Sequence, residues 1–152
     1  MRRFRAWLVG LLSLNGSPRG IAGGFALGLG LSLVPIPVAG MLVALALAPI
    51  VRANPAATYL GSAVVNPFTG PAFYFLELWV GMWLWRLRAP SWEEMGALDG
   101  AGWWALFKDL LGPFLSGAAL VVPVAAGLGY LVVLVLVQRW RAALDRAPPR
   151  AE

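Results

Sequence analysis

The 152-residue sequence contains neither cysteine nor histidine. Without cysteine there is no disulfide, iron–sulfur cluster or thiolate-bound metal, and without histidine there is no imidazole base and no imidazole metal ligand. Charged residues are also scarce: they form 12% of the chain and hydrophobic residues 60%, whereas an average soluble domain is about a quarter charged. These absences nearly exclude a water-soluble globule and most familiar enzyme chemistry. We expect a single-domain membrane protein that is not an enzyme and holds no cofactor or metal.

The few charges form clusters beside long apolar stretches. Residues 1–19 hold four arginines and no acid, residues 139–152 hold four arginines and two acids, and residues 86–109 hold three basic residues and four acids. Such clusters are typical of the flanks of membrane segments, and an excess of arginine marks the cytoplasmic side. We therefore expect a multi-pass protein of the bacterial inner membrane, with both termini cytoplasmic and residues 86–109 outside. The pattern does not indicate a nucleic-acid partner.

The first uncharged stretch, residues 20–51, is too long for a single crossing. Its 32 residues would form a straight helix of about 48 Å, against a hydrocarbon core of roughly 30 Å. Divided at Pro35 and Pro37, the stretch gives two arms of about 22 Å, and neither arm crosses alone. We therefore predict a re-entrant hairpin over residues 18–51, whose half-helices enter and leave by one face.

Small residues recur at every fourth position in both arms of this hairpin. Because lipid provides no hydrophobic force between helices, backbones associate by close approach along such stripes. The pattern predicts that the two arms pack together; the alternative is that glycine and alanine are frequent throughout the chain. The stripes are Gly20, Gly24 and Gly28 in the first arm and Gly40, Ala44 and Ala48 in the second.

The remaining apolar stretches predict one broken and one continuous crossing. Residues 66–71 read Asn-Pro-Phe-Thr-Gly-Pro, and proline both removes an amide donor and disfavours helix at the preceding residue. We predict a broken span over residues 55–85, interrupted near mid-depth at Pro67 and Pro71, and a tilted span over residues 113–138 with a kink at Pro123. The fold expected is an all-α membrane protein with broken or re-entrant helices and about two full transmembrane crossings. Three full crossings rank lower, because they would place the basic tail outside.

Helix starts are indicated by a capping residue followed by proline. The capping side chain accepts a hydrogen bond from the first turn, and proline lacks a donor that this turn leaves unpaired anyway. The pairs predict helices that begin near residues 18, 55 and 67. They are Ser17-Pro18, Asn54-Pro55 and Asn66-Pro67.

The flanks of the membrane domain, residues 15–138, also have expected roles. Residues 1–14 mimic a signal peptide but lack a small-x-small cleavage site, so we expect an interfacial N-terminal helix, with a cleaved leader as the alternative. Residues 86–109 form the outer loop, which has tryptophans at both ends as is typical of membrane interfaces. Residues 139–152 form a basic cytoplasmic tail.

Several short motifs, taken in order, resemble the bacterial membrane family called domain of unknown function two-zero-six-two, over about residues 15–135. The resemblance implies a small inner-membrane protein without an established activity, whose domain is sometimes joined to glycosyltransferase-like regions in other proteins. No such region is present in these 152 residues. The resemblance supplies no catalytic residues to carry over. The motifs include Gly24-Phe25-Ala26-x-Gly28, Pro35-x-Pro37-x-x-Gly40, Arg52-x-Asn54 and Asn66-Pro67-x-Thr69-x-Pro71.

The few polar residues at membrane depth suggest a binding site between the two helix breaks. Asn66, Thr69 and the free amides after Pro67 would face the turn at residues 35–37, with Arg52 and Asn54 at the cytoplasmic mouth. The positive end of the helix and Arg52 would favour an anionic lipid headgroup or a small anion. The alternative is structural: Asn66 caps its helix, Thr69 bonds its own backbone and Arg52 extends to the interface.

Glu77 is the only acid inside an apolar run. An ionised carboxylate within the bilayer costs about 2.5 kcal/mol or more unless it is paired or hydrated. Glu77 could take part in a proton-coupled step or pair with Arg52. Equally, it could face a helix interface in its neutral form.

These features favour a small transporter, channel or lipid-translocating protein with a polar site at the two breaks. A homo-oligomer is expected, because two or three helices cannot enclose a water-filled cavity. The alternative is a non-catalytic membrane scaffold or partner of an envelope-synthesis enzyme.

Overall fold

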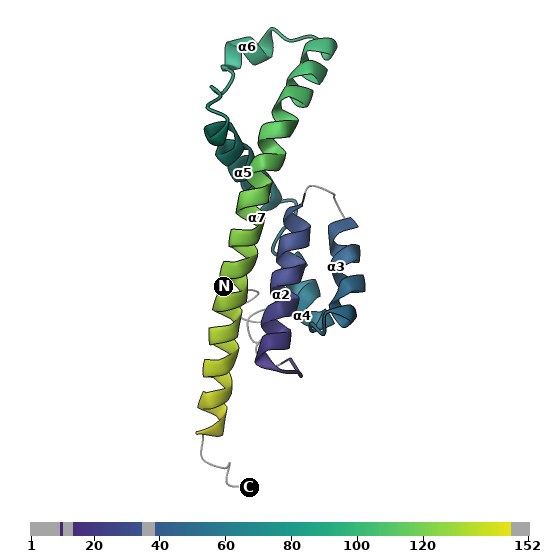
Figure 1. Ribbon diagram of the computed structural model, residues 1–152, viewed down its shortest axis with the longest axis vertical. Helices are drawn as coiled ribbons and strands as arrows, with labels where there is room; N and C mark the ends of the chain where they lie inside the picture. The colour runs from purple at the N-terminus through teal and green to yellow at the C-terminus, as the bar shows by residue number, and fades with distance from the viewer. Residues whose placement is uncertain (1–9, 11–13, 35–38, 147–152) are drawn as a thin grey trace.

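The computed structural model describes residue 10, residues 14–34 and residues 39–146, and these residues form helices and connecting turns without a strand. An all-α fold is therefore confirmed for this part of the chain. The predicted breaks at Pro35 and Pro37, most of residues 1–14 and the end of the tail lie outside it. With the labels of Figure 1, the helices are α2 (Pro18–Leu33), α3 (Ala39–Ile50), α4 (Pro55–Ser62), α5 (Gly70–Leu84), α6 (Trp92–Gly96) and α7 (Gly100–Asp145).

Two of the three predicted helix starts are confirmed. At the start of α2 the Ser17 hydroxyl accepts a hydrogen bond from the amide of Gly20 at 3.0 Å, and at the start of α4 the Asn54 side chain accepts one from the amide of Ala57 at 3.0 Å. The third prediction is wrong, because α5 begins at Gly70 rather than near residue 67. There the Asn66 side chain closes a turn and does not cap a helix.

Helices α2 and α3 form an antiparallel hairpin. Gly40, at the start of α3, lies against the backbone of Leu31 near the end of α2, and the carbonyl of Arg52, after α3, returns to Gly20. Figure 1 shows both open ends of this hairpin at the same end of the pair. Helix α4 then runs parallel to α2, and the Asn54 amide donates to the Gly20 carbonyl at 2.9 Å.

The predicted small-residue stripes are buried, but α2 uses its stripe against a different helix. A Cβ at Gly28 would collide with the Thr58 carbonyl of α4, and one at Gly24 would collide with the Asn54 carbonyl. The α2 stripe therefore faces α4 and not α3, which corrects the expected pairing of the two arms. In α3 the buried residues are the predicted Gly40, Ala44 and Ala48.

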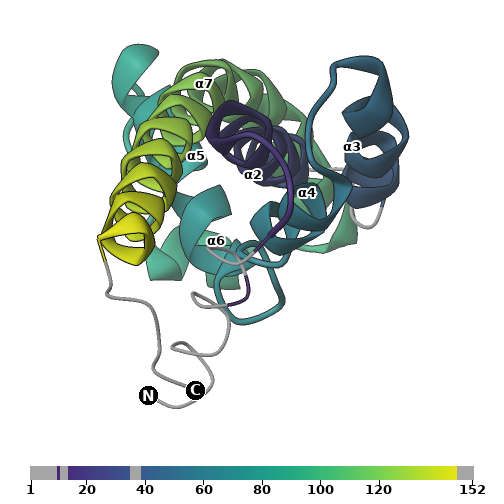
Figure 2. The same ribbon diagram turned by 90° about the horizontal axis from the view of Figure 1, so that it is seen from below.

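Helix α7 has 46 residues, which corresponds to about 69 Å. It begins inside the predicted outer loop, because Asp99 caps it by accepting from the Gly102 amide at 2.7 Å, and it extends beyond residue 138 to Asp145. Its first half packs on α5 and its second half on α2 (Figures 1 and 2). Judged by length and composition, it is the one described helix able to cross a membrane, and its most apolar 18-residue window has a mean hydropathy of 2.7.

The crossing of α5 and α7 depends on two glycines. A Cβ at Gly81 would collide with the carbonyl oxygen of Pro113, and a Cβ at Gly117 would collide with that of Glu77. The helix backbones are therefore in direct contact. Close to this crossing, the Trp85 indole N–H donates to the Ser116 hydroxyl at 3.1 Å.

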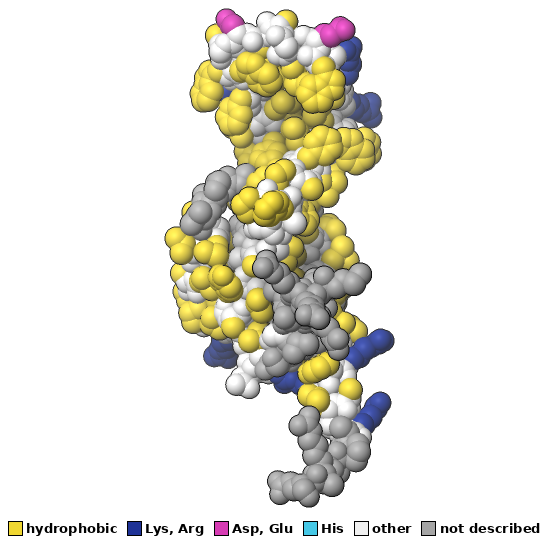
Figure 3. Space-filling view, turned by 180° about the vertical axis from the view of Figure 1, so that it is seen from behind, with side chains coloured by type: hydrophobic (Ala, Val, Ile, Leu, Met, Phe, Trp, Pro, Cys, Tyr) yellow, Lys and Arg dark blue, Asp and Glu magenta, His cyan; other side chains and the backbone are white. Residues whose placement is uncertain are grey.

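The main core lies where α2 meets α7 and α4. Outside this core, large apolar side chains remain exposed along the molecule, including Phe68 at 94% and Val124 at 61%. On the face shown in Figure 3, hydrophobic side chains cover much of the molecule between its ends, the visible acids lie at the α6 end, and Lys and Arg side chains lie both near that end and toward the opposite end. The buried core residues are Ile21, Ala22, Phe25, Leu29, Leu33, Ala57, Val133 and Val137.

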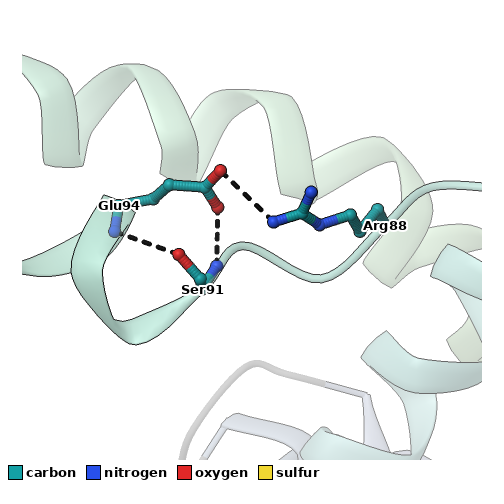
Figure 4. Close-up of polar contacts among 3 residues, drawn as sticks. All are labelled: Arg88, Ser91 and Glu94. Atoms are coloured by element: carbon teal, nitrogen blue, oxygen red, sulfur yellow. Dashed lines mark hydrogen bonds and ion pairs between the residues drawn. The ribbon is translucent and has the colours of Figure 1, made fainter.

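The short helix α6 is fixed by a capping box (Figure 4). The Ser91 amide donates to the Glu94 carboxylate at 2.6 Å, and the Glu94 amide donates to the Ser91 hydroxyl at 3.2 Å. Arg88 lies 3.4 Å from the same carboxylate. The hydrogen bond from the Ser91 backbone, then that from its side chain, then the charge of Arg88 hold the pKa of Glu94 below its usual range.

We predict that Gly117→Ala destabilises the protein, because its methyl group would force α5 and α7 apart. The free energy of unfolding should fall by about 2 kcal/mol or more, measured by denaturant titration of the purified protein in mixed micelles. Gly127→Ala is the matched control, since a Cβ at this position of α7 meets no atom within 4 Å. Equal effects of the two substitutions would contradict the crossing described here.

Candidate functional site

A cavity of about 460 Å³ lies where the ends of α2 and α4 meet the starts of α3 and α5. The end of α2 contributes Ser32, the start of α3 contributes Gly40 and Met41, and the other residues come from the end of α4, the interruption and the start of α5. The predicted break at Pro67 and Pro71 therefore lines the cavity, whereas the predicted break at Pro35 and Pro37 lies outside the described residues. The full lining is Ser32, Gly40, Met41, Ser62, Val65, Asn66, Pro67, Gly70, Pro71 and Tyr74.

The cavity lies at about the same level along the molecule as the middle of the uncharged part of α7. Gly30 of α2 packs against Val122 and Ala126, and the cavity-lining Ser32 is only two residues further along α2. The uncharged part of α7 runs from residue 110 to residue 138, so its centre lies close to Val122. The cavity is consequently far from the charged residues at both ends of α7.

Asn66 and Thr69 are brought together as predicted, but their hydrogen bonds are local. The Asn66 side-chain oxygen accepts from the amides of Phe68 at 2.9 Å and Thr69 at 3.2 Å, and its amide group donates to the Ala63 carbonyl at 3.2 Å. The Thr69 hydroxyl accepts from the Asn66 amide at 3.1 Å and donates to the Val64 carbonyl. This geometry agrees with the structural alternative for Thr69, which bonds the nearby backbone, whereas Asn66 closes a turn and does not cap a helix as that alternative expected.

The predicted free amides after Pro67 are not free. Besides those of Phe68 and Thr69, the Gly70 amide donates to the Asn66 carbonyl at 2.7 Å, and the amides of Ala72 and Phe73 donate to the Thr69 carbonyl at 3.1 and 3.3 Å. Pro71 lies in the first turn of α5, where a missing donor carries no cost. The expectation that this helix start offers donors to an anion is therefore wrong.

Arg52 and Asn54 lie at the other end of α4 from the cavity. The 8 residues of α4 separate them from it, a distance of about 12 Å. Asn54 instead joins segments, since its side chain donates to the Asn15 carbonyl at 2.7 Å, while Arg52 is exposed with a left-handed φ of 57°. The prediction that both residues form the mouth of the site is wrong, because they lie at the start of α4 and the cavity lies at its end.

Glu77 is fully buried where α5 meets α7, and neither of its carboxylate oxygens has a hydrogen-bond partner. The predicted pairing with Arg52 is therefore wrong. The alternative position, at a helix interface, is the one observed. Within the described ranges, Glu77 belongs to no group of three or more acids that could hold a metal ion.

Three polar residues of the cavity wall, Ser32, Ser62 and Tyr74, were missed by the sequence analysis. Ser32 continues the four-residue spacing of Gly24 and Gly28, so the small-residue stripe could have identified it. The Ser32 hydroxyl is buried and has no hydrogen-bond partner. Tyr74 lies one turn after Gly70 in α5 and packs edge-on against Phe114 of α7, with ring centroids 6.3 Å apart. The Ser62 hydroxyl donates to the Gly28 carbonyl at 3.2 Å and so links α4 to α2 beside the cavity.

The chain belongs to the bacterial family described as "Uncharacterized protein conserved in bacteria (DUF2062)", whose sequence profile matches residues 1–145. The resemblance inferred from the motifs is thus confirmed. No curated protein and no solved structure matches the chain significantly. Its function must therefore be inferred from the fold and the cavity.

We predict that Thr69→Val destabilises the interruption, because it leaves the Val64 carbonyl and the Asn66 amide without the hydroxyl. The free energy of unfolding should fall by about 1–2 kcal/mol, again by denaturant titration. Thr69→Ser keeps the hydroxyl and should retain most of the stability. If valine and serine proved equivalent, the hydroxyl would not support this turn.

Proposed function

We propose that this member of the family is a multi-pass protein of the bacterial inner membrane that binds a lipid chain in the cavity and acts as a small transporter or lipid-translocating protein. The observation that carries the proposal is the cavity between the ends of α2 and α4 and the starts of α3 and α5. Its volume of about 460 Å³ falls in the range of ligand sites in proteins, which are typically concave and apolar. Interrupted helices that meet near mid-depth are also how many transporters form their binding sites.

The proposed topology follows from helix lengths and charge. Helices α2 and α5 have 16 and 15 residues, or about 24 and 22 Å, so each is too short to cross a hydrocarbon core of roughly 30 Å. In this proposal α2 and α3 enter and leave by the cytoplasmic face, α4 and α5 together cross once, and α7 crosses back. The arginines at positions 19, 52, 139 and 141 then lie on the cytoplasmic side.

An apolar ligand fits the cavity better than an ion. The amides of the α5 start are already bonded, and the polar side chains at the cavity are two serines, Asn66 and Tyr74. Hard cations require about six oxygen ligands, and an anion would need donors that this helix start no longer offers. A lipid chain needs only apolar walls. We infer that a second copy of the chain completes the enclosure, since α3 and α7 leave many apolar side chains exposed.

The second candidate is a non-catalytic partner of an envelope-synthesis enzyme. It is favoured by an apolar groove of about 290 Å³ on the other side of the glycine crossing, between α5 and the first half of α7. The groove is lined by aromatic and aliphatic side chains that a helix of another membrane protein could cover. They are Leu78, Trp103, Leu106, Phe107, Leu110, Leu111 and Phe114.

We predict that single thiols report the proposed topology without background, because the chain has no cysteine. Val51→Cys, Glu93→Cys and Arg146→Cys place thiols after α3, in α6 and after α7, and all three positions are exposed. In spheroplasts, a membrane-impermeant maleimide should label position 93 directly and positions 51 and 146 only after lysis. Labelling of position 51 from outside would mean that the first hairpin crosses the membrane.

We predict that a phospholipid with a diazirine at the end of one acyl chain crosslinks to cavity residues, mapped by mass spectrometry after reconstitution. Gly70→Leu should reduce the crosslinks to Met41 and Tyr74 about five-fold or more. It fills the cavity, and a Cβ at Gly70 meets other atoms only at ordinary distances of 3.7 Å or more.

Gly127→Leu is the matched control, since Gly127 lies in open space on α7 and should leave these crosslinks unchanged. Crosslinks confined to the exposed face of α7, unaffected by Gly70→Leu, would contradict lipid binding in the cavity. That result would favour the role as a protein partner.

A further inference from the structure

Among the described residues, Glu77 is the one buried acid, and it does not line the proposed lipid cavity. The side chain of this α5 residue is 0% exposed, and its two oxygens have no donor. Its backbone is fixed against α7 by the Gly81–Gly117 crossing. The carboxyl therefore lies at the contact of α5 and α7, shielded from solvent.

No charge lies close enough on the packed helices to neutralise an ionised Glu77. On α7 the charged residues nearest to the Gly117 contact are Lys108 and Asp109, about 12 Å or more along the helix, and α2 carries only Arg19, at its far end. On α5 itself the one other titratable group is Tyr74. An unpaired carboxylate without water or a counter-ion is strongly disfavoured, so the group takes up a proton.

Glu77 is connected to the cavity through Tyr74. The two residues are three positions apart on α5, so their side chains are neighbours on one face of the helix. Tyr74 forms part of the cavity wall. Water in the cavity would lie against Tyr74, one helical turn from the carboxyl. When the cavity holds an apolar chain, the water is expelled and the ionised form is disfavoured further.

We propose that Glu77 is a proton-binding site coupled to occupancy of the cavity, so that a lipid chain and a proton bind together. By linkage, each ligand then strengthens the binding of the other by the same factor. Release of the proton would favour release of the chain. This coupling rests on the proposed lipid binding, whereas the proton site itself does not.

The experiment uses the whole protein in nanodiscs and has two readouts. The first is dicyclohexylcarbodiimide, an apolar reagent to which a protonated carboxylic acid adds across a C=N bond, forming an O-acylisourea that rearranges to a stable N-acylurea. We expect this adduct at Glu77 by mass spectrometry, absent in Glu77→Gln and unchanged in Glu94→Gln. Glu94 is the control because it is exposed on α6.

The second readout is the yield of cavity crosslinks from the diazirine phospholipid between about pH 5 and about pH 9. In the wild type it should fall about five-fold or more as the pH rises. In Glu77→Gln, which mimics the protonated acid, it should stay at the low-pH level throughout.

The outcomes separate the two proposals. No adduct at Glu77 at about pH 5 would overturn the proton site, and this result needs only the wild type. Crosslinking with the same pH dependence in Glu77→Gln would overturn the coupling and leave lipid binding intact. Adduct formation without cavity crosslinks at any pH would overturn lipid binding and the coupling, while the proton site would stand.

Discussion

In the proposed topology the chain is interrupted among lipid chains, where no water is present, so its exposed backbone groups must be satisfied within the protein. Asn66 and Thr69 meet this requirement for residues 63–70, where their side chains bond five backbone groups and the Asn66 carbonyl accepts from Gly70. The turn therefore makes these hydrogen bonds within its own residues, 63–70. It sets the direction in which α5 leaves α4, and with it the position of the cavity.

Close backbone contacts hold the other parts of the site. Because Gly28 has no side chain, the backbone of α4 packs directly against α2. In the same way, Gly81 and Gly117 allow the backbones of α5 and α7 to touch. Lipid provides no hydrophobic force between helices, so helices in a bilayer associate through close van der Waals packing, which small residues allow. These contacts place the end of α2 next to the interruption and bury Glu77 between two backbones. The cavity and the acid are thus products of the same packing.

Local signals in the sequence predicted local structure well. The caps at Ser17 and Asn54 were identified because each depends on a bond over three residues, and the break near Pro67 followed from proline itself. The start of α5 was missed, since Asn66 bonds within a turn. Contacts between residues far apart in the sequence were not predictable. The small-residue stripe of α2 does not indicate which helix it packs against, which is α4. Arg52 and Asn54 were assigned to the same site as Asn66 because they are close to it in sequence, but they lie at the opposite end of α4.

The central claim is that the interruption lies at the centre of the bilayer. Phe68 projects from it with 94% of its surface exposed, so Phe68→Cys provides a single attachment point for a fluorophore. The direct measurement is quenching by phospholipids brominated at different depths along the acyl chain. The account predicts the strongest quenching by bromines near the chain ends. Strongest quenching by bromines near the headgroups, or by iodide in water, would contradict it.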